Sequence, residues 1–124
     1  RPWDKSSFVY NDSRPGSECV PYFSEGDKLQ INDIRDGGCT LFFPQAKIDA
    51  FHVDSYYIKV FDASSHEEVK TVSIWSDYYF NDMPESMTWR IDGFESGRDY
   101  LVEIYAASFW NNYSKERLKG GFRL

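Results

Sequence analysis

The residues of this sequence that could carry out chemistry are few, and their spacing does not match a metal site. His52 lies close to Asp49 and Asp54, and the three side chains could bind a cation. A zinc site normally needs three or four converging nitrogen or sulfur ligands, and a calcium loop needs several oxygen ligands at short, regular spacing around a glycine. Neither spacing is present. We therefore interpret the segment as a solvated polar loop and expect no bound metal or other cofactor.

Catalytic motifs are absent as well. The sequence contains neither a G-x-S-x-G nucleophile motif nor a glycine-rich phosphate loop. Asp27, Asp33, Asp36 and Glu103 could pair with other carboxylates as in a glycosidase. Carboxylates on the exposed faces of strands usually belong to the solvated surface, however. We therefore predict no catalytic residue in this chain.

Length and charge exclude several classes of protein. A chain of 124 residues is sufficient for one domain with one core. Its 20 acidic and 14 basic residues give a net charge of −6, and no cluster of Lys or Arg counters it, so we expect no nucleic-acid partner. The apolar runs are too short for a membrane span. The opening Arg1-Pro2-Trp3-Asp4, without an initiator Met or a signal peptide, leads us to expect a domain cut from a longer chain.

The two cysteines leave the redox state open. Cys19 and Cys39 could form a disulfide, but Cys39 lies in an apolar alternating segment, where a buried free thiol is equally at home. Because geometry decides the question, the sequence favours neither alternative.

The elements that position these residues are strands. Residues 1–27 are rich in Pro, Gly and Ser but also in aromatic residues, so we expect an extended lead-in that packs on the domain. From residue 28 to residue 124 the apolar residues recur at every second position, and no segment shows helical periodicity over more than two turns. This pattern predicts an all-β antiparallel sandwich of seven strands. The predicted strands are residues 28–34, 39–43, 55–62, 69–75, 86–92, 100–106 and 117–124.

One turn in this series has a specific function in the fold. The stretch 94–106, FESGRDYLVEIYA, passes from a small polar turn at Gly97 to Tyr100 and then to strict alternation. A tyrosine at this position can bury its ring and return its hydroxyl to the backbone of the connection between the two sheets, as in a tyrosine corner. We therefore expect structural roles for Phe94, Gly97 and Tyr100, and for Trp89, which is aligned with the apolar residues of its strand.

The same stretch resembles the fibronectin type III pattern of an apolar residue, Pro-Gly, two further residues, Tyr, and alternating aliphatic residues that end in Ala. Upstream, Tyr56, Ile58 and Val60 are similar to the third strand of that family, and the similarity covers residues 28–124. Where the family usually has a Trp shortly before a Pro in the second strand, this sequence has Phe42 and Phe43 before Pro44. The register of the second strand therefore stays open.

On the topology that this resemblance implies, three aromatic-rich loops meet at one end of the sandwich. We predict a binding surface there, formed by Phe51, Tyr78, Tyr79, Phe80, Phe109, Trp110 and Tyr113. Three interpretations compete: the rings cap the core or are covered by residues 1–27, they contact a neighbouring domain, or they stack against carbohydrate.

The resemblance also carries an expectation about function. Modules that resemble this family accompany secreted bacterial hydrolases, including glycosidases and calcineurin-like phosphoesterases, and they space, orient or partly cover the catalytic unit. The phosphoesterase motifs G-D-x-x-D and G-N-H-E are missing here, so any hydrolase activity would belong to another part of the parent protein. We expect an extracellular or cell-surface accessory module that docks onto a neighbouring domain. The alternative is a carbohydrate- or protein-binding module.

Overall fold

A computed structural model describes residues 16–76, 83–108 and 112–124 of the chain. These residues form seven β-strands and a single 3₁₀ turn (Ser17–Cys19), with no α-helix among them. The all-β prediction is therefore confirmed. The strands are β1 (Gln30–Arg35), β2 (Gly38–Pro44), β3 (Val53–Asp62), β4 (Glu68–Trp75), β5 (Ser86–Asp92), β6 (Asp99–Ser108) and β7 (Leu118–Arg123).

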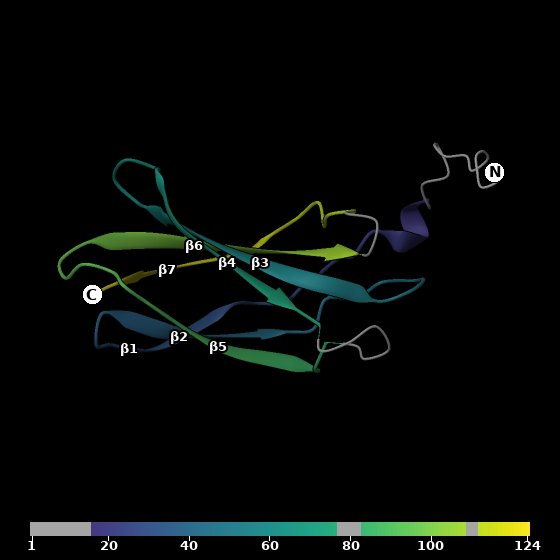
Figure 1. The fold of residues 1–124 in the computed structure, drawn as a ribbon, viewed down its shortest axis with the longest axis horizontal. Coiled ribbons are helices and arrows are strands. Elements are labelled where there is room, and N and C mark those ends of the chain that lie inside the picture. Colours follow the sequence, from purple (N-terminus) through teal and green to yellow (C-terminus); the bar gives the residue numbers. More distant parts are fainter. Residues whose placement is uncertain (1–15, 77–82, 109–111) are drawn as a thin grey trace.

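The strands form two antiparallel sheets that face each other as layers (Figure 1). One sheet has the order β1-β2-β5, and the other has the order β4-β3-β6-β7. The chain crosses between the layers after β2, after β4 and after β5. This arrangement is the seven-stranded sandwich that the alternating pattern predicts.

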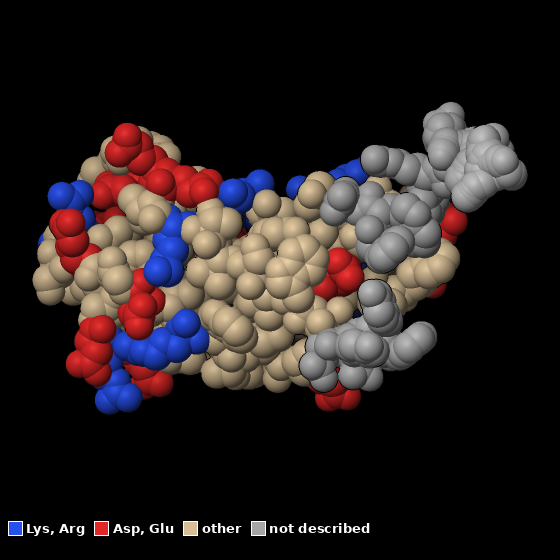
Figure 2. All heavy atoms as spheres, in the orientation of Figure 1, with Lys and Arg blue, Asp and Glu red and all other residues tan. Residues whose placement is uncertain are grey.

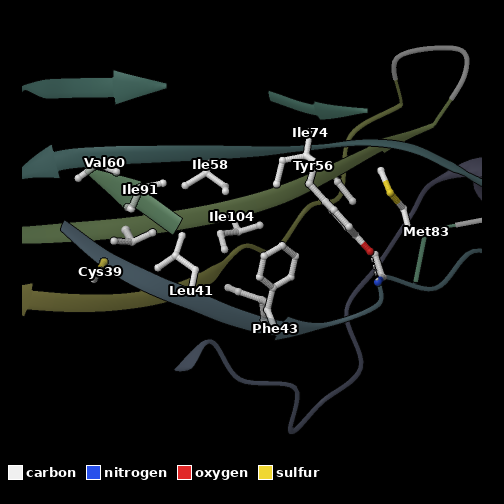
Figure 3. Close-up of a cluster of buried hydrophobic side chains, with 14 of the residues drawn as sticks. Cys39, Leu41, Phe43, Tyr56, Ile58, Val60, Ile74, Met83, Ile91 and Ile104 are labelled. Atoms are coloured by element: carbon white, nitrogen blue, oxygen red, sulfur yellow. Dashed lines mark hydrogen bonds between the residues drawn. The ribbon is translucent and has the colours of Figure 1, made fainter. Parts of the chain in front are cut away.

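The core lies between the sheets and follows the alternation of the sequence (Figure 3). Leu41 and Phe43 of β2 face Tyr56 and Ile58 of β3, and all four side chains are buried. The ring of Phe43 meets the ring of Tyr56 edge-on, with centroids 5.1 Å apart. Phe42 points outward and is exposed. The sequence left the register of β2 open between Phe42 and Phe43. In the structure, Phe43 is the residue that faces the core.

The turn before β6 connects the two sheets, and Tyr100 holds this connection in place. The ring of Tyr100 is buried, and its hydroxyl accepts a hydrogen bond of 3.0 Å from the backbone N–H of Glu95. The ring centroids of Phe94 and Phe122 lie 4.9 and 5.3 Å from that of Tyr100. Gly97 takes a positive φ of 82°, which glycine adopts at little cost. This is the geometry of a tyrosine corner.

Residues 16–27 run along the end of the sandwich where β2 connects to β3. Tyr22 and Lys47 exchange two backbone hydrogen bonds of 2.8 and 2.7 Å. The ring of Phe23 stacks on Tyr56 with centroids 6.4 Å apart. The 3₁₀ turn is a small departure from a wholly extended lead-in, because the backbone N–H groups of Cys19 and Val20 bond back to the turn.

Both cysteines are free and buried. Burial raises the pKa of the Cys39 thiol to about 11, so this group stays protonated at neutral pH. Burial also raises the pKa of Cys19. The alternative of free thiols, which the sequence left open, is the one that the structure contains.

Trp89 shares the inner face of its sheet with Met87 and Ile91 but remains 38% exposed. The reason is its position, because β5 is an edge strand and the opposite layer covers it only in part.

Candidate interaction surface

The predicted loop-end surface lies largely outside the described residues. Of its seven residues, Tyr78, Tyr79, Phe80, Phe109 and Trp110 are not described. Phe51 is 65% exposed and lines a hollow of about 220 Å³ with Ile48 and Met83. Tyr113 is 48% exposed. The grouping of all seven rings at one end stays a prediction.

The structure reveals a second set of aromatic side chains, on the outer face of the four-stranded sheet. We define this aromatic surface as Tyr57, Trp75, Tyr105 and Tyr113. The rings of Tyr57 and Tyr105 stack across β3 and β6 with centroids 5.2 Å apart. The ring centroid of Trp75 lies 6.2 Å from that of Tyr57. The ring centroid of Tyr113 lies 5.8 Å from that of Tyr105 and 6.2 Å from that of Tyr57. Four rings from four segments of the chain therefore form one continuous cluster.

Strand register brings these rings together. Tyr57 of β3 is paired directly with Tyr105 of β6. Tyr113 reaches the sheet through an isolated bridge to Ala107. Both tyrosines of the central strands alternate with buried core residues, so they must point away from the core.

Exposure differs sharply within the aromatic surface. Trp75 is 60% exposed and Tyr113 is 48% exposed, whereas Tyr57 and Tyr105 are half-buried. The two central rings therefore support the two outer ones, which offer free apolar area to a partner.

Arg117 lies beside the aromatic surface. Its guanidinium lies over the ring of Tyr105, 4.5 Å from the centroid, and donates a hydrogen bond of 2.8 Å to Glu103. A cation over a ring face is a favourable arrangement, and the carboxylate holds it in place. Because Tyr57 stacks on Tyr105 from one side and Arg117 lies over it as well, the Tyr105 ring has little free face for a ligand.

The opposite end of the sandwich holds a polar hollow of about 420 Å³, lined by Lys70 and Arg98 among others. Arg98 pairs with Asp62 at 2.9 Å and with Glu95 at 2.8 Å. The pKa of Asp62 is lowered, first by the backbone N–H groups of Ser65 and Ser64 and then by Arg98, against the opposing effect of burial. The charges of this hollow are therefore largely satisfied within the domain.

No group of three or more His, Cys, Asp and Glu side chains that could hold a metal ion occurs among the described residues, the region of His52 included. A search of the described residues also finds no helix long and apolar enough to cross a membrane.

Sequence reasoning missed Tyr57, Trp75 and Tyr105 because it grouped the aromatic residues by loop. A signal was present: each lies on a strand, at a position that alternates with core residues. The alternating pattern can therefore suggest that each of these rings points outward, whereas the strand register decides which rings meet.

Two antiparallel sheets of three and four strands in this order, joined by a tyrosine corner, define a fibronectin type III-like fold. The solution structure of the third fibronectin III domain of the human KIAA0343 protein has this fold. It matches with a TM-score of 0.63 over 93% of this chain and 91% of that chain, at 12% sequence identity. No family model matches the sequence, and no curated protein matches it. The structural likeness therefore shows the fold, which is compatible with a non-catalytic accessory or binding module.

Proposed function

We propose that this chain is a non-catalytic accessory module of a larger exported protein, and that its aromatic surface docks onto a neighbouring domain of the same polypeptide. The observation that carries the proposal is the pair of exposed outer rings, Trp75 at 60% and Tyr113 at 48%, supported from beneath by stacked tyrosines. Clustered exposed aromatic area marks interaction sites, and Trp and Tyr supply much of the binding free energy at protein interfaces.

The shape of the surface favours a protein partner over a small ligand. None of the hollows described above is lined by Tyr57, Trp75, Tyr105 or Tyr113. Small-molecule sites are concave, whereas protein interfaces are broad and have an aromatic centre with a polar rim. Arg117 and Glu103, at the border of the cluster, provide such a rim.

The sequence resemblance to fibronectin type III modules supports a proposal about which kind of domain the neighbour is. Modules similar to this one accompany secreted hydrolases, so we propose a hydrolase as the neighbour, with a metallophosphoesterase among the candidates, and an extracellular or cell-surface location.

The experiment compares the full-length parent protein with its Trp75→Ser, Tyr113→Ser double variant. We expect the double variant to weaken the contact between the domains by about 2 kcal/mol or more, because two large apolar side chains are lost. Small-angle X-ray scattering should then show a larger radius of gyration for the variant. The control is Phe42→Ser, on the outer face of the other sheet, which should leave the radius unchanged.

An unchanged radius in the double variant, with the fold intact by circular dichroism, would contradict docking through this surface. Glycan-array binding by the wild-type chain that disappears in the same variant would instead support the carbohydrate-binding alternative.

A further inference from the structure

The free edge of β4 offers a second interaction surface, one that does not depend on the docking function. Within residues 16–76, 83–108 and 112–124, β4 lies at the end of the four-stranded sheet and has β3 as its one strand neighbour. A sheet edge presents unpaired backbone N–H and C=O groups, and proteins normally shield such edges with charges, prolines, bulges or short strands.

The other three edge strands carry shielding of this kind. β1 has an irregular register between Asn32 and Arg35. Arg90 of β5 donates hydrogen bonds to the Asp33 and Arg35 carbonyl groups of β1, and β5 itself carries the exposed charged residues Arg90 and Asp92. β7 is only six residues long, and two of its exposed residues, Lys119 and Arg123, are charged.

β4 also changes its register, at Val69, but the residues that follow this shift have none of these devices. Residues 71–75, TVSIW, contain no charge, no Pro and no Gly, and three of the five are β-branched. The adjacent Lys70 is half-buried, with its ammonium 5.8 Å from the centroid of the Phe94 ring, on the inner side of the strand. In Figure 2, the middle of the visible face, where Figure 1 shows the end of β4, is nearly free of Lys, Arg, Asp and Glu.

The backbone of this stretch is oriented for pairing. Ser76 N–H donates to the Asp54 carbonyl of the β3 side at 2.9 Å. Residues along an antiparallel strand alternate between bonding to one neighbour and facing the other side. Thr71, Ser73 and Trp75 therefore direct their N–H and C=O groups away from β3, toward the open edge.

We propose that two copies of this chain pair antiparallel through β4 about a twofold axis, with Val72 beside Val72 of the second copy. The two four-stranded sheets then become one continuous sheet of eight strands. Such a self-complementary contact is the usual geometry of a twofold dimer.

This register is complementary over residues 71–75, beyond Val69, where β4 changes its register against β3. It places Thr71 opposite Ser73 of the second copy, and facing hydroxyl side chains are a favourable cross-strand pair. Lys70 falls opposite the uncharged Ile74, so no like charges face each other in this stretch. A second copy is therefore a fitting occupant of this edge.

The experiment is sedimentation velocity on the full chain over about 10 to 500 µM, because a short edge-to-edge contact buries little area and is weak. We expect a concentration-dependent dimer, with more dimer at high salt because the net charge of −6 on each copy is then screened. Ser73→Pro should abolish the dimer, since it removes an outward N–H that β3 does not use. Ser73→Ala, which retains this N–H, should dimerise like the wild type.

A second pair of variants tests the register and does not introduce a proline. Thr71→Lys combined with Ser73→Lys sets like charges opposite each other and should abolish the dimer, whereas Thr71→Lys combined with Ser73→Glu should restore it. A wild type that stays monomeric at 500 µM, equal dimerisation of Ser73→Pro and Ser73→Ala, or equal behaviour of the two charged pairs would overturn the proposal. Tyr113→Ser, which weakens docking alone, should leave the dimer unchanged.

Discussion

A single hydroxyl group, that of Tyr100, joins the strand β6 to the connection that leads into it. The Tyr100 hydroxyl accepts from the backbone N–H of Glu95 at 3.0 Å while the ring is buried against Phe94 and Phe122. Replacing Tyr100 by Phe keeps the ring but leaves that N–H without its partner. We expect the free energy of unfolding to fall by about 1–2 kcal/mol, measured by urea denaturation.

Tyr105→Phe is the matched control, because it removes a hydroxyl from the outer face of the same strand. It should change the free energy of unfolding by less than about 0.5 kcal/mol, as is usual for surface positions. Equal losses in the two variants would show that the Tyr100 hydroxyl has no special part in holding the fold.

At the scale of elements, Asp62 links two connections between strands. Its carboxylate accepts hydrogen bonds from Ser64 and Ser65 within the β3–β4 connection and forms an ion pair with Arg98 of the β5–β6 connection. These partners hold the pKa of Asp62 below its usual value, with the Ser65 and Ser64 N–H groups having the largest effects. The ionised form of Asp62 therefore stabilises the folded state.

The sign of the pH dependence follows from this depressed pKa. The stabilisation is fully present above the unfolded-state pKa of about 3.9 and is lost as the pH falls through the lower pKa of the folded state. We expect Asp62→Asn to be less stable than the wild type at pH 7, and the difference to shrink below about pH 4. Urea unfolding at pH 7, 5 and 3 measures it. Asp99→Asn, which breaks an exposed ion pair with Arg123, should have a smaller effect, and a pH-independent difference for Asp62→Asn would refute the assignment.

The strands and the tyrosine corner could be predicted because both depend on local sequence. Alternation fixes which side of a strand is buried, as at Ile58 and Ile104, and a small turn before Tyr100 marks the crossing. The aromatic surface could not be predicted in the same way. Its centre exists because Tyr57 and Tyr105, 48 positions apart by number, are in register across β3 and β6, and pairing register is a property of the whole sheet.

At the scale of the whole molecule, the two ends of the sandwich differ in chemistry. Charged side chains gather over the end that holds the β3–β4 and β5–β6 connections (Figure 2), where Asp62, Glu95 and Arg98 neutralise one another. Toward the other end, the outer face of the four-stranded sheet carries exposed rings instead. This asymmetry gives the domain one end with satisfied charges and one face suited to burial against a partner.

The most direct test of the docking account measures the solvent exposure of Trp75 and Tyr113 in the full-length protein. Hydroxyl-radical footprinting with mass spectrometry reports the oxidation of individual aromatic side chains, and dilute protein avoids self-association. We expect both residues to oxidise at least about threefold more slowly in the full-length protein than in the 124-residue chain alone, because an interface excludes water from its centre. Phe42, exposed on the other sheet, should oxidise equally in both. Equal oxidation of Trp75 and Tyr113 in the two proteins would contradict the account.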